Sequence, residues 1–243
     1  MRNDGQTMTG HAMTGRATPG APRADEAQTL ARLEADIIFG VFAPGTRLVE
    51  DALMARYAVS RHFVRQALVQ LDRQGIVRRE RNIGATVCSY TAEEVRQIYD
   101  VREMLTRQAA LLIPLPAPAA LIARVGQLQA QYCAAIDAGD LRGIHAANDA
   151  FHVALFSACG NPYLVRSLQD YMGLTLLMRA KNLAEPAGLL LSRRQHAIMI
   201  ELLHGRDPWA LAQLCVAHMQ SSKAEYLARI DASHADRPMA AVA

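Results

Sequence analysis

The sequence predicts a mainly α protein, in which an N-terminal winged helix-turn-helix is followed by an all-α antiparallel helical bundle. Three observations support this prediction. The first third of the chain shows the order helix, helix, turn, helix and then a β-hairpin. The rest has helical periodicity, with proline and glycine at the interruptions. Between Arg56 and Arg81 a short basic segment holds seven arginines against two acids.

The basic segment is the main electrostatic feature of the chain, because the net charge is only +3. From Thr91 to the end, fourteen basic residues balance fourteen acids. A local excess of arginine is typical of a module that meets a polyanion. Charge alone fits a solvated basic face equally well.

Cysteine usage and hydropathy exclude several classes of protein. The four cysteines form no CxxC pair, which disfavours a disulfide framework and fits a reducing compartment, so we expect a cytoplasmic protein. No apolar run reaches the ~18 residues of a membrane span, and no membrane partner is expected. Residues 1–24 lack the apolar core of a signal peptide, and we expect them to form a disordered arm.

The elements of the N-terminal domain follow from periodicity and turn signals. Residues 25–40 predict the first helix, a turn follows at 43–46, and a short helix is predicted over about 50–56. Ser60 is the predicted N-cap of a third helix that Gly75 ends. Two extended runs, at 76–80 and 85–88, are joined by a turn at 81–84 and predict a β-hairpin.

From Thr91 onward the chain predicts only helices. A capping box formed by Thr91 and Glu94 opens the first of them, which runs to about residue 112. The further helices are predicted over about 119–138, 140–159, 162–183, 188–204 and 208–231. The expected organisation is a disordered arm (1–24), a winged helix-turn-helix domain (25–90), an all-helical domain (91–231) and a frayed tail (232–243).

The third helix carries the candidate DNA-reading residues. Its apolar face would dock on the first two helices, which leaves Arg61 and Arg65, four residues apart, on another face with His62 beside them. Base edges in the major groove are read by side chains near the N-terminus of such a helix, and arginine can pair with guanine or clamp a phosphate. In the hairpin turn, Asn82 and Gly84 can approach the DNA backbone or minor groove. Taken alone, the two arginines are more often plain surface charges.

Helix-borne histidines offer a candidate metal site in the C-terminal domain. Asn148 and His152 stand at i and i+4 and share a helix face, while His196 and His218 lie on the last two predicted helices. A helical bundle can bring three such faces to one internal point. Three imidazoles and one oxygen donor suit Zn²⁺, with Ni²⁺ or Mn²⁺ as alternatives. Taken one by one, such histidines are more often structural than ligating.

Motifs over about 65 N-terminal residues carry a family resemblance: PGTRL at 44–48, VSRHFVRQAL at 59–68, GIV at 75–77 and NIGATV at 82–87. In these motifs the chain resembles the DNA-binding domain of the GntR family of transcriptional regulators. The resemblance implies that DNA is faced by Ser60, Arg61, His62, Phe63 and Arg65, with the wing glycine, Gly84, close to it. The pair His62-Phe63 stands where the family usually has Thr-Pro or a similar small pair, which leaves the operator sequence open.

A second resemblance covers residues 91–229. Its motifs are NDAFH at 148–152, ACGNP at 158–162, HAI at 196–198, GRDP at 205–208 and HM at 218–219. They resemble the FCD effector domain of the FadR-type subfamily. The resemblance implies a divalent metal held by Asn148, His152, His196 and His218, with Asn148 standing where aspartate is frequent. It also implies a small carboxylate effector, which Arg102 would pair with. The alternative for Arg102 is an exposed arginine beside Glu103.

Together these resemblances imply a DNA-binding transcriptional regulator without enzymatic activity. We expect a homodimer that binds a pseudo-palindromic operator as a repressor, with an operator affinity that changes when a small organic acid binds at the metal site. Two alternatives stay open, a helical-bundle metalloenzyme and a DNA-binding dimerisation module without an effector. The metalloenzyme is disfavoured because the one Glu-x-x-His match, at 201–204, falls at a helix end, and no HExxH motif occurs.

Overall fold

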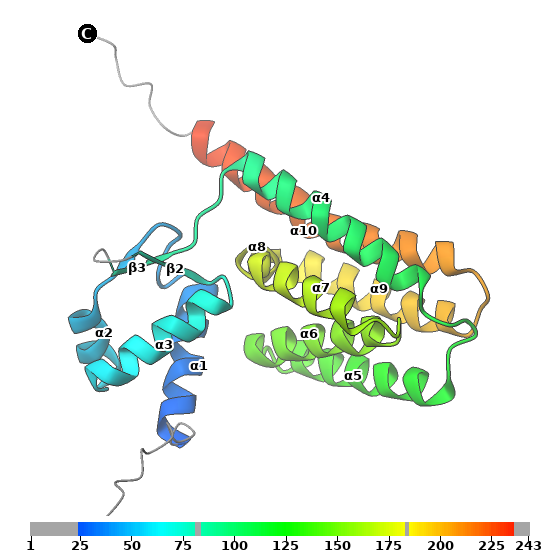
Figure 1. Cartoon of the computed structure of the whole chain (residues 1–243), viewed down its shortest axis with the longest axis horizontal. Helices are drawn as coiled ribbons and strands as arrows, with labels where there is room; N and C mark the ends of the chain where they lie inside the picture. The colour runs from blue at the N-terminus through cyan, green and yellow to red at the C-terminus, as the bar shows by residue number, and fades with distance from the viewer. Residues whose placement is uncertain (1–23, 81–83, 183–184, 236–243) are drawn as a thin grey trace, which may run out of the picture.

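The computed structural model describes residues 24–80, 84–182 and 185–235 of the chain. An N-terminal unit of three helices and a small sheet stands beside a larger bundle of helices (Figure 1). The prediction of a mainly α protein with an N-terminal helix-turn-helix and a C-terminal helical domain is confirmed. Most of the predicted arm and the end of the tail lie outside the described residues.

The N-terminal unit contains the predicted helices and hairpin, together with one further strand. Its elements are α1 (Ala24–Ile38), β1 (Arg47–Leu48), α2 (Glu50–Tyr57), α3 (Arg61–Arg73), β2 (Val77–Glu80) and β3 (Gly84–Val87). The sheet is antiparallel in the order β1-β3-β2, with Arg47 opposite Thr86. The sequence did not predict β1, because two residues are too few to show alternation.

Local interactions set the bounds of α3. The predicted N-cap at Ser60 is confirmed, since its hydroxyl oxygen accepts a hydrogen bond from the Phe63 N–H at 3.2 Å. The predicted stop at Gly75 has φ +72°, a left-handed conformation that favours glycine. The apolar face of α3 is buried in a cluster shared with α1 and the sheet.

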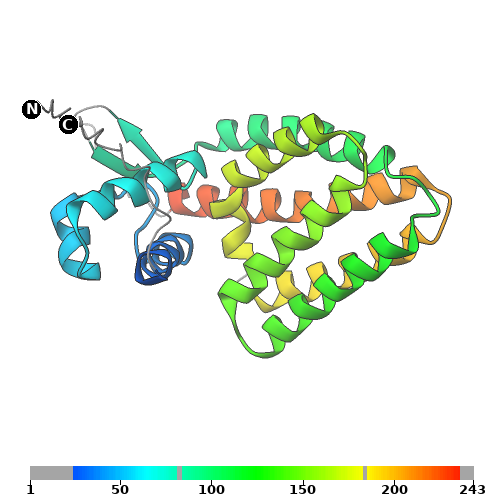
Figure 2. The same ribbon diagram turned by 60° about the horizontal axis from the view of Figure 1, so that its bottom comes forward.

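The C-terminal domain is an antiparallel bundle. Its helices are α4 (Ala92–Leu111), α5 (Ala119–Asp137), α6 (Leu141–Ser157), α7 (Pro162–Leu174), α8 (Leu176–Asn182), α9 (Pro186–Leu203) and α10 (Pro208–Ala235). The long helices α4 and α10 lie side by side in Figures 1 and 2. The predicted capping box is confirmed, because Thr91 and Glu94 bond each other's backbone N–H groups at 2.8 and 3.2 Å. Within the described residues, none of the helices has the length and apolar content needed to cross a membrane.

Thr175 divides into two helices a segment for which the sequence predicts a single helix over 162–183. The Thr175 hydroxyl lies 3.0 Å from the Tyr171 carbonyl and 3.2 Å from the Met172 carbonyl. Arg179 also donates a hydrogen bond to the Met172 carbonyl, at 3.0 Å. The Tyr171 carbonyl also accepts the Thr175 N–H at 3.2 Å, as in a regular helix, whereas the Met172 carbonyl accepts from both side chains; α7 ends there and α8 begins at Leu176. The prediction of one helix is therefore wrong.

Other helix ends differ from the sequence prediction by a few residues, among them those of α1 at Ile38 and α6 at Ser157, each two residues before the predicted end. Helix α9 begins at Pro186, two residues before the predicted start, because proline is well suited to the first position of a helix. Helix α10 continues to Ala235, beyond the predicted end at residue 231. The predicted frayed tail therefore begins within a helix.

The two domains touch where α3 ends and α7 meets α8. A Cβ placed on Gly173 would lie 3.0 Å from the Gln74 carbonyl oxygen, and one on Gly75 would lie 3.3 Å from Leu174. The buried cluster of the N-terminal unit also continues into α8 and α10, through Met178 and Tyr226. The end of the candidate reading helix is thus packed directly on the C-terminal domain.

Candidate metal centre and DNA-reading surface

Three of the predicted metal ligands converge inside the bundle. His152 comes from α6, His196 from α9 and His218 from α10, and their ring nitrogens lie within 4.8 Å of one another. The Nε2 atom of His152 lies 3.0 Å from that of His218 and 3.3 Å from that of His196. We call these three residues the histidine centre.

Glutamine side chains orient two of the three rings. Gln129 donates its amide N–H to the Arg193 carbonyl at 3.0 Å, so its oxygen accepts from Nδ1 of His196, also at 3.0 Å. Gln195 Oε1 lies 2.8 Å from Nδ1 of His218. A ring that donates from Nδ1 and is neutral presents the lone pair of Nε2. Neither glutamine is predicted from the sequence, because each lies far along the chain from the histidine it orients.

The geometry of the histidine centre favours a cation at the common point. Two Nε2 lone pairs, from His196 and His218, face Nε2 of His152. One proton on His152 could satisfy only one of them at a time, whereas a cation at that point would serve all three nitrogens. Outer hydrogen bonds of the kind made here by glutamine are what orient metal-ligating histidines in other proteins.

Burial keeps the three rings in the neutral form that binds metals. Desolvation lowers the pKa of His152 and His196 well below 6.5, and the neighbouring histidines lower them further. Burial, with Arg102 and Arg179 close by, lowers the pKa of His218 to about 3. At neutral pH the rings are therefore not held in the imidazolium form, which has no lone pair for a metal.

Asn148, the fourth predicted ligand, lines the same cavity as His152 and His218. Its side chain is buried and donates from Nδ2 to Asp149 Oδ1 at 3.2 Å. The amide oxygen is therefore the group of Asn148 that can serve a metal. Unlike aspartate, it would bring no charge to the site.

Two buried arginines stand beside the histidine centre. Arg102 is 6% exposed, so the alternative of an exposed arginine beside Glu103 is wrong, and its Nη1 donates to the Thr175 hydroxyl at 3.0 Å. Arg179 is 5% exposed and donates to Asp149 at 2.6 Å. Burial, and then the charge of Arg179, lowers the pKa of Arg102 to about 10. Arg179 was missed by the sequence analysis, because nothing in its local pattern marks it.

The charges around this cavity do not balance. Two guanidinium groups face one carboxylate, that of Asp149, and the three imidazoles are neutral. The Nε atoms of Arg102 and Arg179 have no hydrogen-bond partner among the residues that the structure describes. The cavity has a free volume of only about 10 Å³, room for little more than one water-sized group. Any group larger than a water molecule would require the walls to move.

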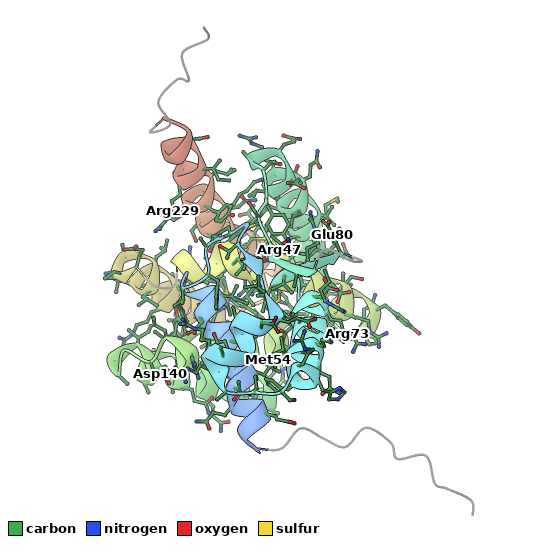
Figure 3. All side chains as sticks on the ribbon, turned by 90° about the vertical axis from the view of Figure 1, so that its left-hand side faces the viewer. Arg47, Met54, Arg73, Glu80, Asp140 and Arg229 are labelled. Carbon is green, nitrogen blue, oxygen red and sulfur yellow. The ribbon has the colours of Figure 1, made fainter. Side chains whose placement is uncertain are left out.

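The predicted DNA-reading arginines lie on the surface at the start of α3. The side chains of Arg61 and Arg65 are 50% and 60% exposed, and His62 is exposed beside them. Arg65 donates from Nε to both carboxylate oxygens of Glu50 at 3.0 Å, and Arg61 pairs with Asp51. Glu50 and Asp51 open α2 and were not singled out in the sequence. Figure 3 views the molecule from the side of this unit, with Arg47 and Arg73 labelled.

Three further residues of the predicted DNA surface differ in their placement. Phe63 is 6% exposed and belongs to the core of the N-terminal unit, so its side chain does not face outward as expected. The correction follows from helix geometry, because Phe63 shares the buried face with Ala67 and is turned away from Arg61. Gly84 is exposed at the start of β3 with φ +109°. Asn82 lies outside the described residues.

Two family models match the chain. The model described as "Bacterial regulatory proteins, gntR family" matches residues 26–87, and the model of the FCD domain matches residues 97–221. The first contains the arginine surface of α3, and the second contains the histidine centre together with Arg102 and Arg179.

Curated relatives and a solved structure are similar to the chain. An uncharacterized HTH-type transcriptional regulator of Bacillus subtilis, YdhC, is 27% identical over 188 residues, which cover 77% of this chain and 84% of that protein. The gluconate operon transcriptional repressor of Bacillus licheniformis is 46% identical over 66 residues, 27% of each chain. A crystal structure from Rhodococcus sp. RHA1, described as that of "a putative transcriptional regulator GntR", has the same fold, with a TM-score of 0.64 and 24% identity over 85% of this chain and 99% of that one.

Proposed function

The chain belongs to the GntR family of bacterial regulators and carries an FCD domain, and on that premise we propose that it is a metal-dependent repressor controlled by a small carboxylate. Family membership makes it a transcription regulator and not an enzyme. Repression is supported by relatives such as the gluconate operon repressor, whose name states that role. We assign DNA binding to residues 25–90 and effector binding to residues 91–231.

The observation that carries the proposal is the convergence of three neutral imidazole nitrogens beside two buried guanidinium groups. His152, His196 and His218 would hold a divalent metal, with the Asn148 oxygen as a fourth ligand. Zn²⁺ is our first choice, and Ni²⁺ or Mn²⁺ would also fit nitrogen and oxygen donors. Such a metal supplies open coordination positions for a carboxylate oxygen.

The charge in the cavity makes an acid the expected effector. Arg102 and Arg179 already exceed Asp149 by one positive charge, and a divalent metal adds two more. Buried charge is stable only when it is paired, so an anion should bind there in preference to a neutral molecule. We assign Arg102 to the effector carboxylate, because its buried guanidinium lines this cavity and donates to the neutral Thr175 hydroxyl rather than to a carboxylate.

On the DNA side, each subunit of a homodimer would place α3 in a major groove of a pseudo-palindromic operator. Arg61, His62 and Arg65 would read or clamp the DNA, and Ser60 would hold the start of the helix. The wing residues Asn82 and Gly84 would approach the backbone or minor groove. Phe63 supports this surface from the core.

A chain of contacts can carry the effector signal to the DNA-binding domain. Arg102 bonds Thr175 and Arg179 bonds the Met172 carbonyl, so both arginines hold the junction of α7 and α8. That junction touches the end of α3, where Gly173 meets Gln74. An acid that draws the guanidinium groups toward itself would shift the junction and hence α3. Such couplings typically amount to about 1–3 kcal/mol.

The metal proposal is tested with a matched pair of histidine variants. His196→Ala should lose bound Zn²⁺ and the rise in thermal midpoint that Zn²⁺ gives. His204→Ala, which removes an exposed histidine at the end of α9, should keep both. Should the fully buried His196 prove necessary for folding, His218→Gln gives the same test at a half-buried position. If His196→Ala and His218→Gln bind as much metal as the wild type and His204→Ala, the proposed site is contradicted.

The effector proposal is tested on the metal-loaded protein. Small mono- and dicarboxylates should raise the thermal midpoint and change operator affinity in the wild type, and both effects should be weaker in Arg102→Gln. If metal binds but no acid shifts the midpoint or operator affinity, the protein is a dimerisation module without an effector.

A further inference from the structure

The outward face of α3 carries a glutamine beside the arginines already described. Gln66 is exposed on this face, and its side-chain amide has no hydrogen-bond partner within the part of the chain that the structure describes. We infer that Gln66 is a specificity-determining residue, whose amide reads an adenine in the major groove of the operator. The inference rests on the proposed DNA binding by α3 and adds the base that this position selects.

Burial fixes which side chains of α3 point away from the protein. The buried face consists of Phe63, Val64, Ala67, Leu68 and Leu71. Successive side chains are turned by about 100° around a helix, so the direction opposite this face is that of His62 and Val69. Arg65 and Gln66 flank that direction, one on each side. Gln66 is therefore as well placed as Arg65 to meet a ligand of this face.

The outward residues also have the spacing of a base-reading stripe. They stand at i, i+3, i+4 and i+7 along α3, and they are His62, Arg65, Gln66 and Val69. In homeodomains the recognition helix contacts bases from positions with the same spacing, and an asparagine at i+4 contacts adenine. The i+4 position of α3 is Gln66, which ends in the same amide group as asparagine.

Gln66 differs from the neighbouring arginines because no described residue binds its amide. Arg65 is held by Glu50, and Arg61 by Asp51, so both arginines are drawn toward α2. Gln66 lies on the opposite side of the stripe and lines a surface groove of about 500 Å³ between α3 and α1. An amide in this position can reach base edges without first breaking a hydrogen bond to a described residue.

The first half of α3 is open to a duplex. The helix begins at the side of the N-terminal unit away from the bundle and ends beside the bundle (Figure 1). Close contacts with the effector domain lie at its end, where Gln74 and Gly75 meet Gly173 and Leu174. Gln66 is exposed about two turns before that end, so the effector domain does not cover it.

The chemistry of the amide favours adenine over the other bases. Glutamine offers an acceptor and a donor side by side, and adenine presents the complementary N6 donor and N7 acceptor in the major groove. Guanine presents two acceptors there, which suit the donors of Arg65 instead. Val69, three residues on, offers an apolar contact for the methyl group of a thymine. This side of α3 should therefore select an A·T pair.

The test begins with selection from a randomised duplex library by the full chain, without added acid. The wild type should enrich a two-fold motif. Gln66→Ala should enrich the same motif except at one position of each half-site, where the wild type requires adenine. Gln66→Glu should prefer cytosine at that position, because a carboxylate accepts from the N4 amino group of cytosine. A motif that is unchanged in Gln66→Ala, or that changes only at a G·C pair, would overturn the inference.

Binding to single duplexes checks that the base is read in the major groove. Inverting the selected pair from A·T to T·A leaves the acceptors of the minor groove in place. The inversion should weaken binding by the wild type about tenfold or more, whereas Gln66→Ala should bind both duplexes alike. If Gln66→Ala instead weakens binding to every duplex equally, Gln66 contacts phosphate and the inference is wrong.

Gln70→Ala is the matched control for these measurements. Gln70 is an exposed residue of the same type, one turn after Gln66 but turned further toward the side of the helix. Gln70→Ala should keep the wild-type motif at every position, and loss of the same adenine in this variant would refute the assignment to Gln66. A wild type that enriches no motif would refute DNA recognition by α3 as a whole, which is the proposed function itself.

Discussion

Single side chains decide how the arginines of α3 are presented to DNA. Glu50 places a negative charge on the surface that is proposed to meet phosphates, and this charge should weaken DNA binding by repulsion. The contacts of Glu50 indicate what it contributes in return. It holds Nε of Arg65 with both oxygens and leaves the two terminal nitrogens of that arginine free of this contact. Those nitrogens can pair with O6 and N7 of guanine. Glu50 is therefore best understood as a residue that positions Arg65.

Replacing Glu50 with glutamine should raise the affinity for DNA in general and lower the preference for the operator. Glu50→Gln removes the repulsion from phosphates, so binding to unrelated DNA should tighten, while the preference for the operator should fall. Arg65→Ala should weaken operator binding by about 1–3 kcal/mol. Fluorescence anisotropy with operator and scrambled duplexes measures both, and Glu93→Gln, at the exposed start of α4, is the control. An unchanged operator preference in Glu50→Gln would show that the acid has no positioning role.

The buried His145 predicts a dependence of stability on pH. The folded protein holds the pKa of His145 at about 4, below its ordinary value of 6.5. As pH falls below 6.5 the unfolded chain takes up a proton that the folded protein refuses, so stability is lost between about pH 6.5 and 4. The loss from this residue should reach up to about 3 kcal/mol.

Urea unfolding of the wild type and His145→Phe across this range measures that loss. The buried histidines of the centre act in the same direction in both proteins, so the difference between the two isolates His145. Parallel curves for the two proteins would mean that His145 is not held neutral.

At the scale of helices, the junction of α7 and α8 joins the effector domain to the reading helix. Thr175 and Arg179 both donate to the Met172 carbonyl at the end of α7. Gly173 lies just before the junction, and because it has no side chain the backbone of α7 comes close to the end of α3. A side chain at this position would separate the two helices.

Gly173→Ala should therefore destabilise the protein, although alanine normally stabilises a helix relative to glycine. The new Cβ would lie 3.0 Å from the Gln74 carbonyl oxygen, and displacement of that backbone should cost about 1–3 kcal/mol. Gly126→Ala is the matched control within α5, since no atom lies within 4 Å of its new Cβ, and it should stabilise by up to about 1 kcal/mol.

Unfolding midpoints and operator titrations with and without effector measure both consequences. Bound metal should stay the same in Gly173→Ala, while the effect of the effector on operator affinity should shrink. If Gly173→Ala stabilises the protein as Gly126→Ala does, the close contact between α7 and α3 is not maintained in solution.

In the molecule as a whole, the excess of positive charge is small but is concentrated in the N-terminal unit. The net charge is only +3, yet the arginines of the N-terminal unit stand together while the helical domain is balanced. The attraction to DNA should therefore depend on a few phosphate contacts. Inside the protein, positive charge is likewise concentrated in one place, where Arg102 and Arg179 stand beside the histidine centre.

Operator binding should weaken steeply as salt rises, because each phosphate contact releases a counterion. A plot of the logarithm of the binding constant against that of salt concentration should have a negative slope, and Arg61→Ala should reduce its magnitude by about one. Arg194→Ala, on the exposed surface of α9, should leave the slope unchanged. A flat plot for the wild type would rule out arginine-driven binding.

Interactions between residues close in sequence could be predicted without the structure. Ser60 caps α3 and Thr91 pairs with Glu94, because each cap joins residues three apart. Helical periodicity gave the fold class and most of the helices, since a buried face repeats along the chain whatever it packs against. Family resemblance, not periodicity, pointed to the three histidines, which lie on separate helices. The wing residues and the DNA-facing roles stay predictions.

Contacts between distant residues were decided by the tertiary structure alone. Gln129 orients His196 across 67 positions, and Arg179 pairs with Asp149 across 30. The break at Thr175 and the burial of Phe63 likewise depend on what lies opposite them. Amino-acid order determines which faces of each helix are apolar, but the packing of the helices determines which polar groups meet between them.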